Sequence, residues 1–201
     1  MSEEKHPTAI LIATDLSARC DRALDRAVLL ADAWQARLVV LHVIEDSSAL
    51  EAMFDPAPAS TAQDPVAAAR RELIRDIGAV ADTATLVIER GRPADAIIRV
   101  AAREGCDLIV LGIARDEPFG RYSLGGTDDR LLRGSPAPLL IVKGRARRPY
   151  ERIAIATDFS DSSRHALDAA FRLFPEQLVY VANHAEDEVG FVDRSLAKLL
   201  W

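Results

Sequence analysis

The chain has 201 residues, of which 31 are acidic and 25 are Lys or Arg, so its formal net charge is −6. Its 49% of hydrophobic and 28% of charged residues are typical of a folded globular protein rather than a disordered chain. The acidic balance and the 5% of aromatic residues argue against a nucleic-acid-binding protein, which uses basic patches and stacking side chains.

The apolar stretches are strand-sized and fall far short of the roughly 20 residues of a membrane helix. The polar N-terminal residues 1–5 lack the apolar core of a secretory signal, so we expect a cytosolic protein that does not associate with a membrane. Cys20 and Cys106 belong to no CxxC pair, so we expect two reduced thiols and neither a disulfide nor a zinc site.

The chain opens with a strand, a helix and a second strand. The segment 8–14 is β-rich and almost wholly apolar, as in a strand buried on both faces. Ala and Leu then recur at helical spacing over 16–36, with Ser17 as the expected N-cap. A second apolar strand follows at 37–44, which completes a βαβ unit with parallel strands.

The same alternation continues to residue 143. Apolar strands that alternate with helices five times indicate an α/β fold, an open, doubly wound, five-stranded parallel sheet of Rossmann-like type with helices on both faces. The further predicted elements are a loop at 45–64, a helix at 65–79, a strand at 83–89, a helix at 93–103, a strand at 107–112, a loop at 113–126, a helix at 127–133 and a strand at 138–143.

A second copy of the opening pattern begins after a basic, proline-containing linker at 145–151. Asp15 and Ser17 correspond to Asp158 and Ser160, shifted by 143 positions. We therefore expect a complete domain at 1–144 and an incomplete second copy at 152–201, made of a strand, a helix, a strand and a tail helix. Such a fragment needs its apolar side chains covered by the first domain, by another chain or by further residues. These side chains belong to Ile153, Ile155, Phe159, Phe171, Phe174, Val179 and Trp201.

Candidate binding residues lie at the ends of two predicted strands. In an open parallel sheet, ligands bind beyond the carboxyl ends of the strands, where the strand order reverses. If the first and fourth strands are neighbours, Asp15 and Ser17 line this crevice together with the loop after Gly112. Gly126 and Thr127 open the following helix, whose free N–H groups can bind an anion. The competing interpretation is that Asp15 and Ser17 cap a helix and the glycines form turns.

Six short motifs follow one another along the chain: Asp15-x-Ser17, Leu41-His42-Val43, Gly91-x-Pro93, Leu108–Gly112, Gly126-Thr127 and Pro138–Val142. Taken in this order, they resemble the universal stress protein family. The resemblance covers residues 8–143 and the start of the second copy, and it implies a tandem-type member that acts in the stress response. It also implies a homodimer formed through the strand at 138–143, with the partial second copy as a further surface for self-association.

Some members of the family bind ATP, and the resemblance implies which residues would do so here. Asp15, with Ser17 beside it, and the backbone of Val43 would hold the ribose and the adenine. Gly112, Gly126 and Thr127 would border the phosphates. The sequence departs from the family's phosphate loop in three ways. Arg115 stands in place of a glycine, and the loop is one residue longer. Asp128 and Asp129 add negative charge to the first turn of the helix. Arg115 and Arg121 would offset this negative charge if their side chains point inward.

Other functions have less support from the residues. An adenylating enzyme needs a Gly-rich loop after the first strand, but this chain has no glycine between Asp15 and Arg19. A weak ATP hydrolase is the remaining enzymatic alternative. A phospho-receiver needs further carboxylates around Mg²⁺. His42 and His184 are expected to be structural, because no partner at metal-binding spacing accompanies them. We therefore predict a non-catalytic binding module that holds no metal and whose ligand is ATP or another adenine nucleotide.

Overall fold

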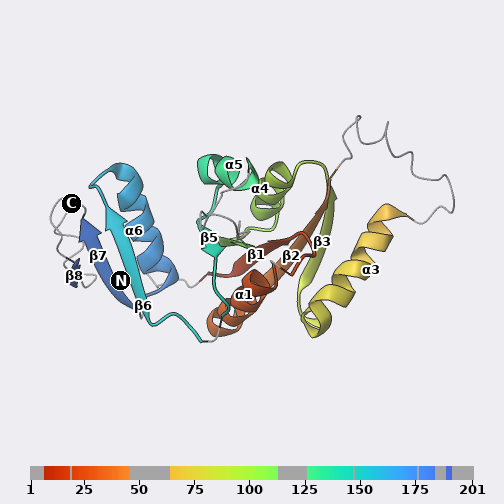
Figure 1. Cartoon of the computed structure of the whole chain (residues 1–201), viewed down its shortest axis with the longest axis horizontal. Coiled ribbons are helices and arrows are strands. Elements are labelled where there is room, and N and C mark those ends of the chain that lie inside the picture. Colours follow the sequence, from red (N-terminus) through yellow and green to blue (C-terminus); the bar gives the residue numbers. More distant parts are fainter. Residues whose placement is uncertain are drawn as a thin grey trace, which may run out of the picture. The chain divides into compact units, whose positions relative to one another are not determined.

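The computed structural model describes residues 7–18, 20–45, 64–112, 126–146, 148–175, 177–183 and 189–191. The chain forms two compact units, a larger one over Thr8–Arg147 and a smaller one that begins at Arg148 (Figure 1). None of the helices within the described ranges has the length and apolar character required to cross a membrane.

The larger unit is built on a parallel sheet with the strand order β3-β2-β1-β4-β5. Every neighbouring pair of strands is parallel, and the chain order reverses at β1, which lies in the middle. This is the doubly wound five-stranded sheet that the sequence predicts. The strands are β1 (Ala9–Thr14), β2 (Arg37–Ile44), β3 (Thr85–Arg90), β4 (Leu108–Gly112) and β5 (Leu139–Val142).

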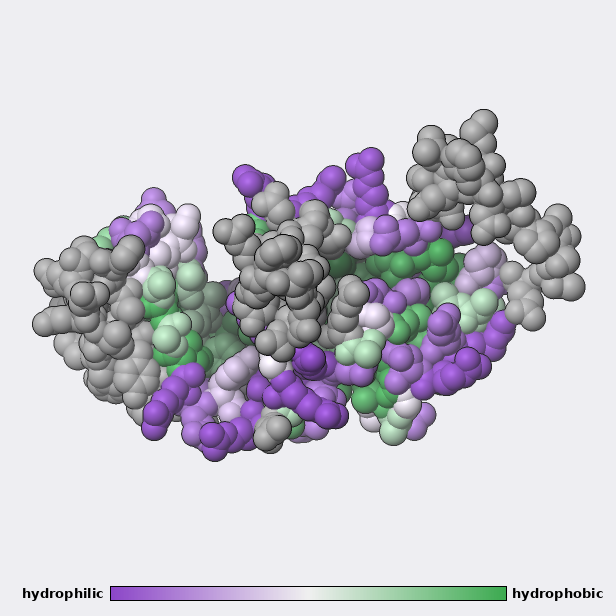
Figure 2. All heavy atoms as spheres, in the orientation of Figure 1, coloured by the Kyte–Doolittle hydropathy of each residue, from purple (hydrophilic) through white to green (hydrophobic). Residues whose placement is uncertain are grey.

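Helices cover both faces of this sheet, α1 and α3 on one face and α4 and α5 on the other (Figure 1). Right-handed crossovers that run in opposite directions from β1 place the two pairs on opposite faces. Hydrophilic residues cover much of the outward surface of these helices (Figure 2). The helices are α1 (Asp21–Trp34), α3 (Pro65–Ile77, continued by a 3₁₀ turn at Gly78–Asp82), α4 (Pro93–Arg103) and α5 (Gly126–Gly134).

The central strands are buried on both faces, which explains their unbroken apolar sequence. Ile10, Leu11 and Ile12 of β1 have no exposed surface. On one face, Leu11 packs in a core cluster with Ile97 and Val100 of α4. A strand buried on both sides fixes its register strongly, so the ends of β1, β2 and β4 have defined positions relative to one another.

Helix α1 begins later than the sequence predicts. It starts at Asp21 rather than at residue 16, and Cys20, not Ser17, occupies the N-cap position. The expectation that Ser17 caps this helix is therefore wrong. The cause is local: the side chain of Ser17 donates a hydrogen bond back to Asp15, and its carbonyl accepts from the amide of Cys20, so these residues form a turn.

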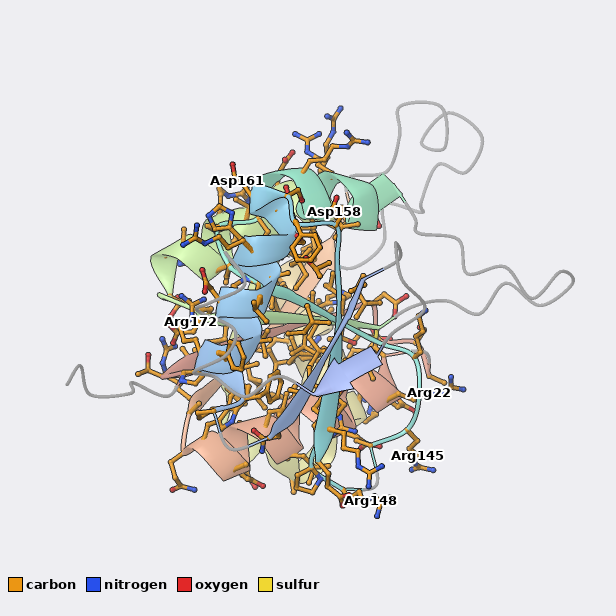
Figure 3. All side chains as sticks on the ribbon, turned by 90° about the vertical axis from the view of Figure 1, so that its left-hand side faces the viewer. Arg22, Arg145, Arg148, Asp158, Asp161 and Arg172 are labelled. Atoms are coloured by element: carbon orange, nitrogen blue, oxygen red, sulfur yellow. The ribbon has the colours of Figure 1, made fainter. Side chains whose placement is uncertain are left out.

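The smaller unit contains a second parallel βαβ arrangement, β6 (Arg152–Thr157), α6 (Asp161–Leu173) and β7 (Leu178–Asn183). Leu167 of α6 and Ile155 of β6 form its buried centre. Ser160 caps α6, because its hydroxyl oxygen accepts a hydrogen bond from the amide of Ser163 at 3.3 Å. Asp158 and Asp161 lie at the N-terminal end of α6 and Arg172 near its other end, which suits the helix dipole (Figure 3).

One expectation for this unit is wrong in the described residues. Val189–Phe191 is a strand, β8, paired antiparallel with β7, where the start of a tail helix was expected. A β-branched and an aromatic residue around a glycine favour a strand over a helix. Phe159 is half exposed within this chain, so the expectation that another chain or further residues cover it stays a prediction. Trp201 lies outside the described residues, as does the side chain of Val179.

Candidate functional site

The candidate site lies where the carboxyl ends of β1, β2 and β4 meet. In the register of the sheet, Thr14 pairs with His42, and Ile12 pairs with Val110. Asp15 therefore follows the end of β1 at the same edge at which β4 ends on Gly112. Helices diverge to opposite faces at this reversal of strand order, which leaves space for a ligand between the loops.

The loop from β1 to α1 has an unusual backbone conformation. Leu16 has a φ of 61°, a left-handed geometry that side chains with a Cβ rarely adopt. The amide of Leu16 donates to Oγ1 of Thr14 at 3.0 Å, which holds this geometry. The turn directs the side chain of Asp15 toward Ser17 and Cys20.

Three donors converge on one oxygen of Asp15. Oδ1 accepts hydrogen bonds from the amide of Ser17 at 2.9 Å, from the hydroxyl of Ser17 at 2.6 Å and from the thiol of Cys20 at 3.2 Å. The described residues form no hydrogen bond with the other oxygen, Oδ2. The carboxylate is thus held firmly while one oxygen can still accept hydrogen bonds from a ligand.

The hydrogen bond between Asp15 and Cys20 favours an ionised carboxylate and a protonated thiol. Partial burial acts to raise the pKa of Asp15, but the hydrogen bonds from Ser17 and Cys20 outweigh it and leave the pKa below its ordinary value. Burial, together with the nearby Asp15 carboxylate, raises the pKa of the Cys20 thiol to about 11. At neutral pH the aspartate is therefore ionised, and Cys20 keeps the proton that it donates.

His42 and Val43 complete the edge on the β2 side. Nδ1 of His42 lies 3.0 Å from the carbonyl oxygen of Thr14, a bond to backbone that fits the structural role expected for this residue. The ladder between β1 and β2 ends at His42, so Val43 is the first residue of β2 beyond the end of β1.

The structure brings together Asp15, Ser17, Val43 and Gly112, the part of the predicted site that the described residues contain. Arg115 lies outside the described residues, as do Arg121 and His184. Gly126 begins α5, so residues 127–129 belong to its first turn, but the side chains of these residues are also outside the described part. The described residues include no group of three or more His, Cys, Asp or Glu placed to hold a metal ion.

Sequence reasoning missed two contributors to this site, Thr14 and Cys20. Their signal is visible in the internal repeat, where Thr14 corresponds to Thr157 and Cys20 to Ser163. In the smaller unit, the amide of Phe159 donates to Oγ1 of Thr157 at 3.1 Å, and the amide of Ser160 donates to Oδ1 of Asp158 at 3.0 Å. The two loops therefore share one hydrogen-bonding scheme.

A separate groove of about 710 Å³ lies on the α1 and α3 face of the larger unit. Leu24 and Val28 of α1 line it together with Ile77 at the end of α3. Arg145, which forms an ion pair with Asp25 at 3.5 Å, also lines it. Asp15, Ser17, Val43 and Gly112 are not among its lining residues, so this groove is distinct from the candidate site.

Known proteins share both the sequence and the fold of the larger unit. The sequence model of the universal stress protein family matches residues 8–143. The universal stress protein in the QAH/OAS sulfhydrylase 3′ region of Thermus aquaticus is 32% identical over 136 residues, which are 67% of this chain and 97% of that protein.

Among solved structures, the universal stress protein UspA from Lactobacillus plantarum is 24% identical, with a TM-score of 0.51, over 69% of this chain and 99% of its own. A universal stress protein solved in complex with cAMP is 24% identical over 69% of this chain and 98% of its own, with a TM-score of 0.47. The family match and the identity to the Thermus aquaticus protein together cover the whole five-stranded unit. The chain therefore belongs to the universal stress protein family.

Proposed function

We propose that the larger unit is a non-catalytic regulatory module of the stress response that binds ATP or another adenine nucleotide beside Asp15. The observation that carries this proposal is the Asp15 carboxylate, which is ionised at neutral pH, fixed by three donors through Oδ1 and situated at the reversal point of the sheet. A fixed carboxylate oxygen accepts hydrogen bonds well from the hydroxyl groups of a ribose.

The neighbouring residues suit the other parts of a nucleotide. Val43 extends beyond the end of β1, so its backbone groups can pair with the polar edge of an adenine. Gly112 starts the segment that leads to α5, and the N–H groups in the first turn of α5 can bind phosphate. The resemblance to the family assigns these same positions to adenine, ribose and phosphate.

We further propose that the protein acts as a cytosolic homodimer joined through β5. This strand lies at one edge of the sheet, and its apolar residues Leu139, Leu140 and Ile141 are only half buried. An apolar edge strand offers its backbone for pairing with another strand, and a symmetric dimer would pair β5 with β5.

Isothermal titration calorimetry with ATP tests the nucleotide proposal. The wild-type protein should give saturable heat, and Asp15→Asn should weaken binding more than tenfold, because it replaces a charged acceptor. Asp158→Asn is the matched control, since it makes the same change in the equivalent loop of the smaller unit. Saturable binding that Asp15→Asn leaves unchanged would refute the assignment of the site.

The enzymatic alternative, a weak ATP hydrolase, is tested on the same samples by measuring inorganic phosphate. A non-catalytic module should release no more phosphate than Asp15→Asn does. Sustained release that this substitution abolishes would favour the enzyme instead.

A further inference from the structure

Cys20 occupies a position that the sequence alone does not mark as functional. It is the N-cap residue of α1, and the amide of Leu24 donates to its carbonyl at 2.9 Å. Its side chain makes no capping bond to the helix. Instead, Sγ lies 3.2 Å from Oδ1 of Asp15 and 4.0 Å from the carbonyl oxygen of Ala13. The thiol therefore turns away from the helix and toward the candidate site.

The smaller unit provides an internal comparison. Ser163 stands at the position of Cys20, and its hydroxyl lies 3.0 Å from Oγ1 of Thr157 and donates to the carbonyl oxygen of Ser160 at 3.0 Å. Hydrogen bonding from Ser160 lowers the pKa of Asp158 to about 2. The larger unit therefore differs from the smaller one: it places a thiol within hydrogen-bond distance of the aspartate, whereas the hydroxyl of Ser163 bonds to Thr157 and Ser160.

We propose that Cys20 is a positioning residue for nucleotide binding, whose S–H group fixes the Asp15 carboxylate in the orientation that accepts a ribose. This inference rests on the proposed function of the Asp15 site. The thiol and Ser17 both bind Oδ1, which restrains rotation of the carboxylate and keeps Oδ2 directed toward a ligand. Because α1 holds the backbone of Cys20, the position of the carboxylate depends on the first turn of that helix.

The geometry makes the contribution of Cys20 separable from that of Ser17. Ser17 lies two residues after Asp15 in the same turn, so changing it alters the turn itself. Cys20 reaches Asp15 from the next element, and replacing its side chain leaves both Ser17 bonds in place. The substitution therefore changes the restraint on the carboxylate without removing the loop that carries it.

The test compares Cys20→Ala, which removes the donor, with Cys20→Ser, which keeps a donor, an O–H group, at the same position. Cys106→Ala is the matched control, because Cys106 is a buried cysteine that packs in the core of the same unit. Two readouts are measured for each variant: the pKa of Asp15, from the ¹³C chemical shift of its carboxyl carbon, and the dissociation constant for ATP. Thermal unfolding of each variant shows whether the fold is retained.

In Cys20→Ala the pKa of Asp15 should rise and ATP binding should weaken about three- to tenfold, because a donor to the charged form is lost. Cys20→Ser should keep both values near wild type, and Cys106→Ala should change neither. An unchanged Asp15 pKa in Cys20→Ala would overturn the positioning role, as would equal losses of affinity in Cys20→Ala and Cys20→Ser. If the wild type does not bind ATP, the proposed function fails, while the Asp15 pKa still decides whether Cys20 fixes the carboxylate.

Discussion

Leu16 and Phe159 adopt the same left-handed backbone conformation, with φ values of 61° and 59°, at corresponding positions of the β1–α1 and β6–α6 loops. In each loop the amide of this residue donates to the threonine that ends the preceding strand, Thr14 or Thr157. A non-glycine residue in this region is strained, and both loops hold it with the same bond. The resulting turn lets the aspartate accept a hydrogen bond from the amide two residues later, at 2.9 Å in one loop and 3.0 Å in the other.

This strain predicts the effect of a β-branched residue at position 16. Leu16→Val should destabilise the protein by about 1–2 kcal/mol, because a branched Cβ fits the left-handed region poorly. Urea unfolding followed by circular dichroism measures the change. Leu132→Val, at an exposed position of α5, is the control and should cost less than about 0.5 kcal/mol. Equal effects of the two substitutions would show that the loop stores no strain.

The ionised aspartates predict how stability depends on pH. The pKa of Asp15 lies below its ordinary value of 3.8, and that of Asp158 lies at about 2. The stability that they contribute is therefore complete above the unfolded value and is lost as the pH falls through the folded values. The free energy of unfolding should fall between about pH 5 and about pH 1, and Asp15→Asn should make this fall smaller. A fall of the same size in the variant would contradict the assigned hydrogen bonds.

The two acidic residues in the first turn of α5 predict that removing their charge will raise the affinity for ATP. Asp128 and Asp129 follow Gly126, the first residue of this helix, where negative charge opposes a bound phosphate. The double substitution Asp128→Asn with Asp129→Asn should strengthen ATP binding by about 0.3–1 kcal/mol for each charge removed. Calorimetry measures the dissociation constant. An unchanged or weaker affinity would mean that α5 does not face the phosphates.

The open edge at β5 predicts the effect of a charge on assembly. Ile141→Lys should convert a dimer into a monomer in sedimentation velocity, because it places a charge beside an apolar interface. Ile88→Lys makes the same change on β3, the opposite edge of the sheet, and should leave the dimer intact. A wild-type monomer, or dissociation by both substitutions, would refute the β5 interface.

Much of the larger unit could be predicted from the sequence because its strands are buried on both faces. The apolar segment at 37–44 coincides with β2. Helix α4 begins at Pro93, as expected for a proline in the first turn of a helix. The start of α1 could not be predicted in this way. Local hydrogen bonds of Asp15 and Ser17 compete there with the helix, and residue spacing does not reveal them.

The candidate site was predictable in part. The strand order, which follows from the fold class, brings Asp15 and Gly112 to one edge of the sheet. The role of Cys20 was not predictable from spacing, because a cysteine at a helix start is ordinarily a small apolar residue. The internal repeat marks the position, and the 3.2 Å contact with Asp15 indicates what the thiol does there. Likewise, β8 is defined by its antiparallel pairing with β7, which the residue spacing that predicted a tail helix does not reveal.

The most direct test of the nucleotide site is to follow the backbone amide resonances of the protein while ATP is added. The account predicts saturable shifts at Asp15, Ser17, Val43 and Gly112, together with the amides of the first turn of α5. The amides of the equivalent loop around Asp158 should stay unchanged. Saturable shifts confined to other parts of the chain, or no shifts at millimolar ATP, would contradict it.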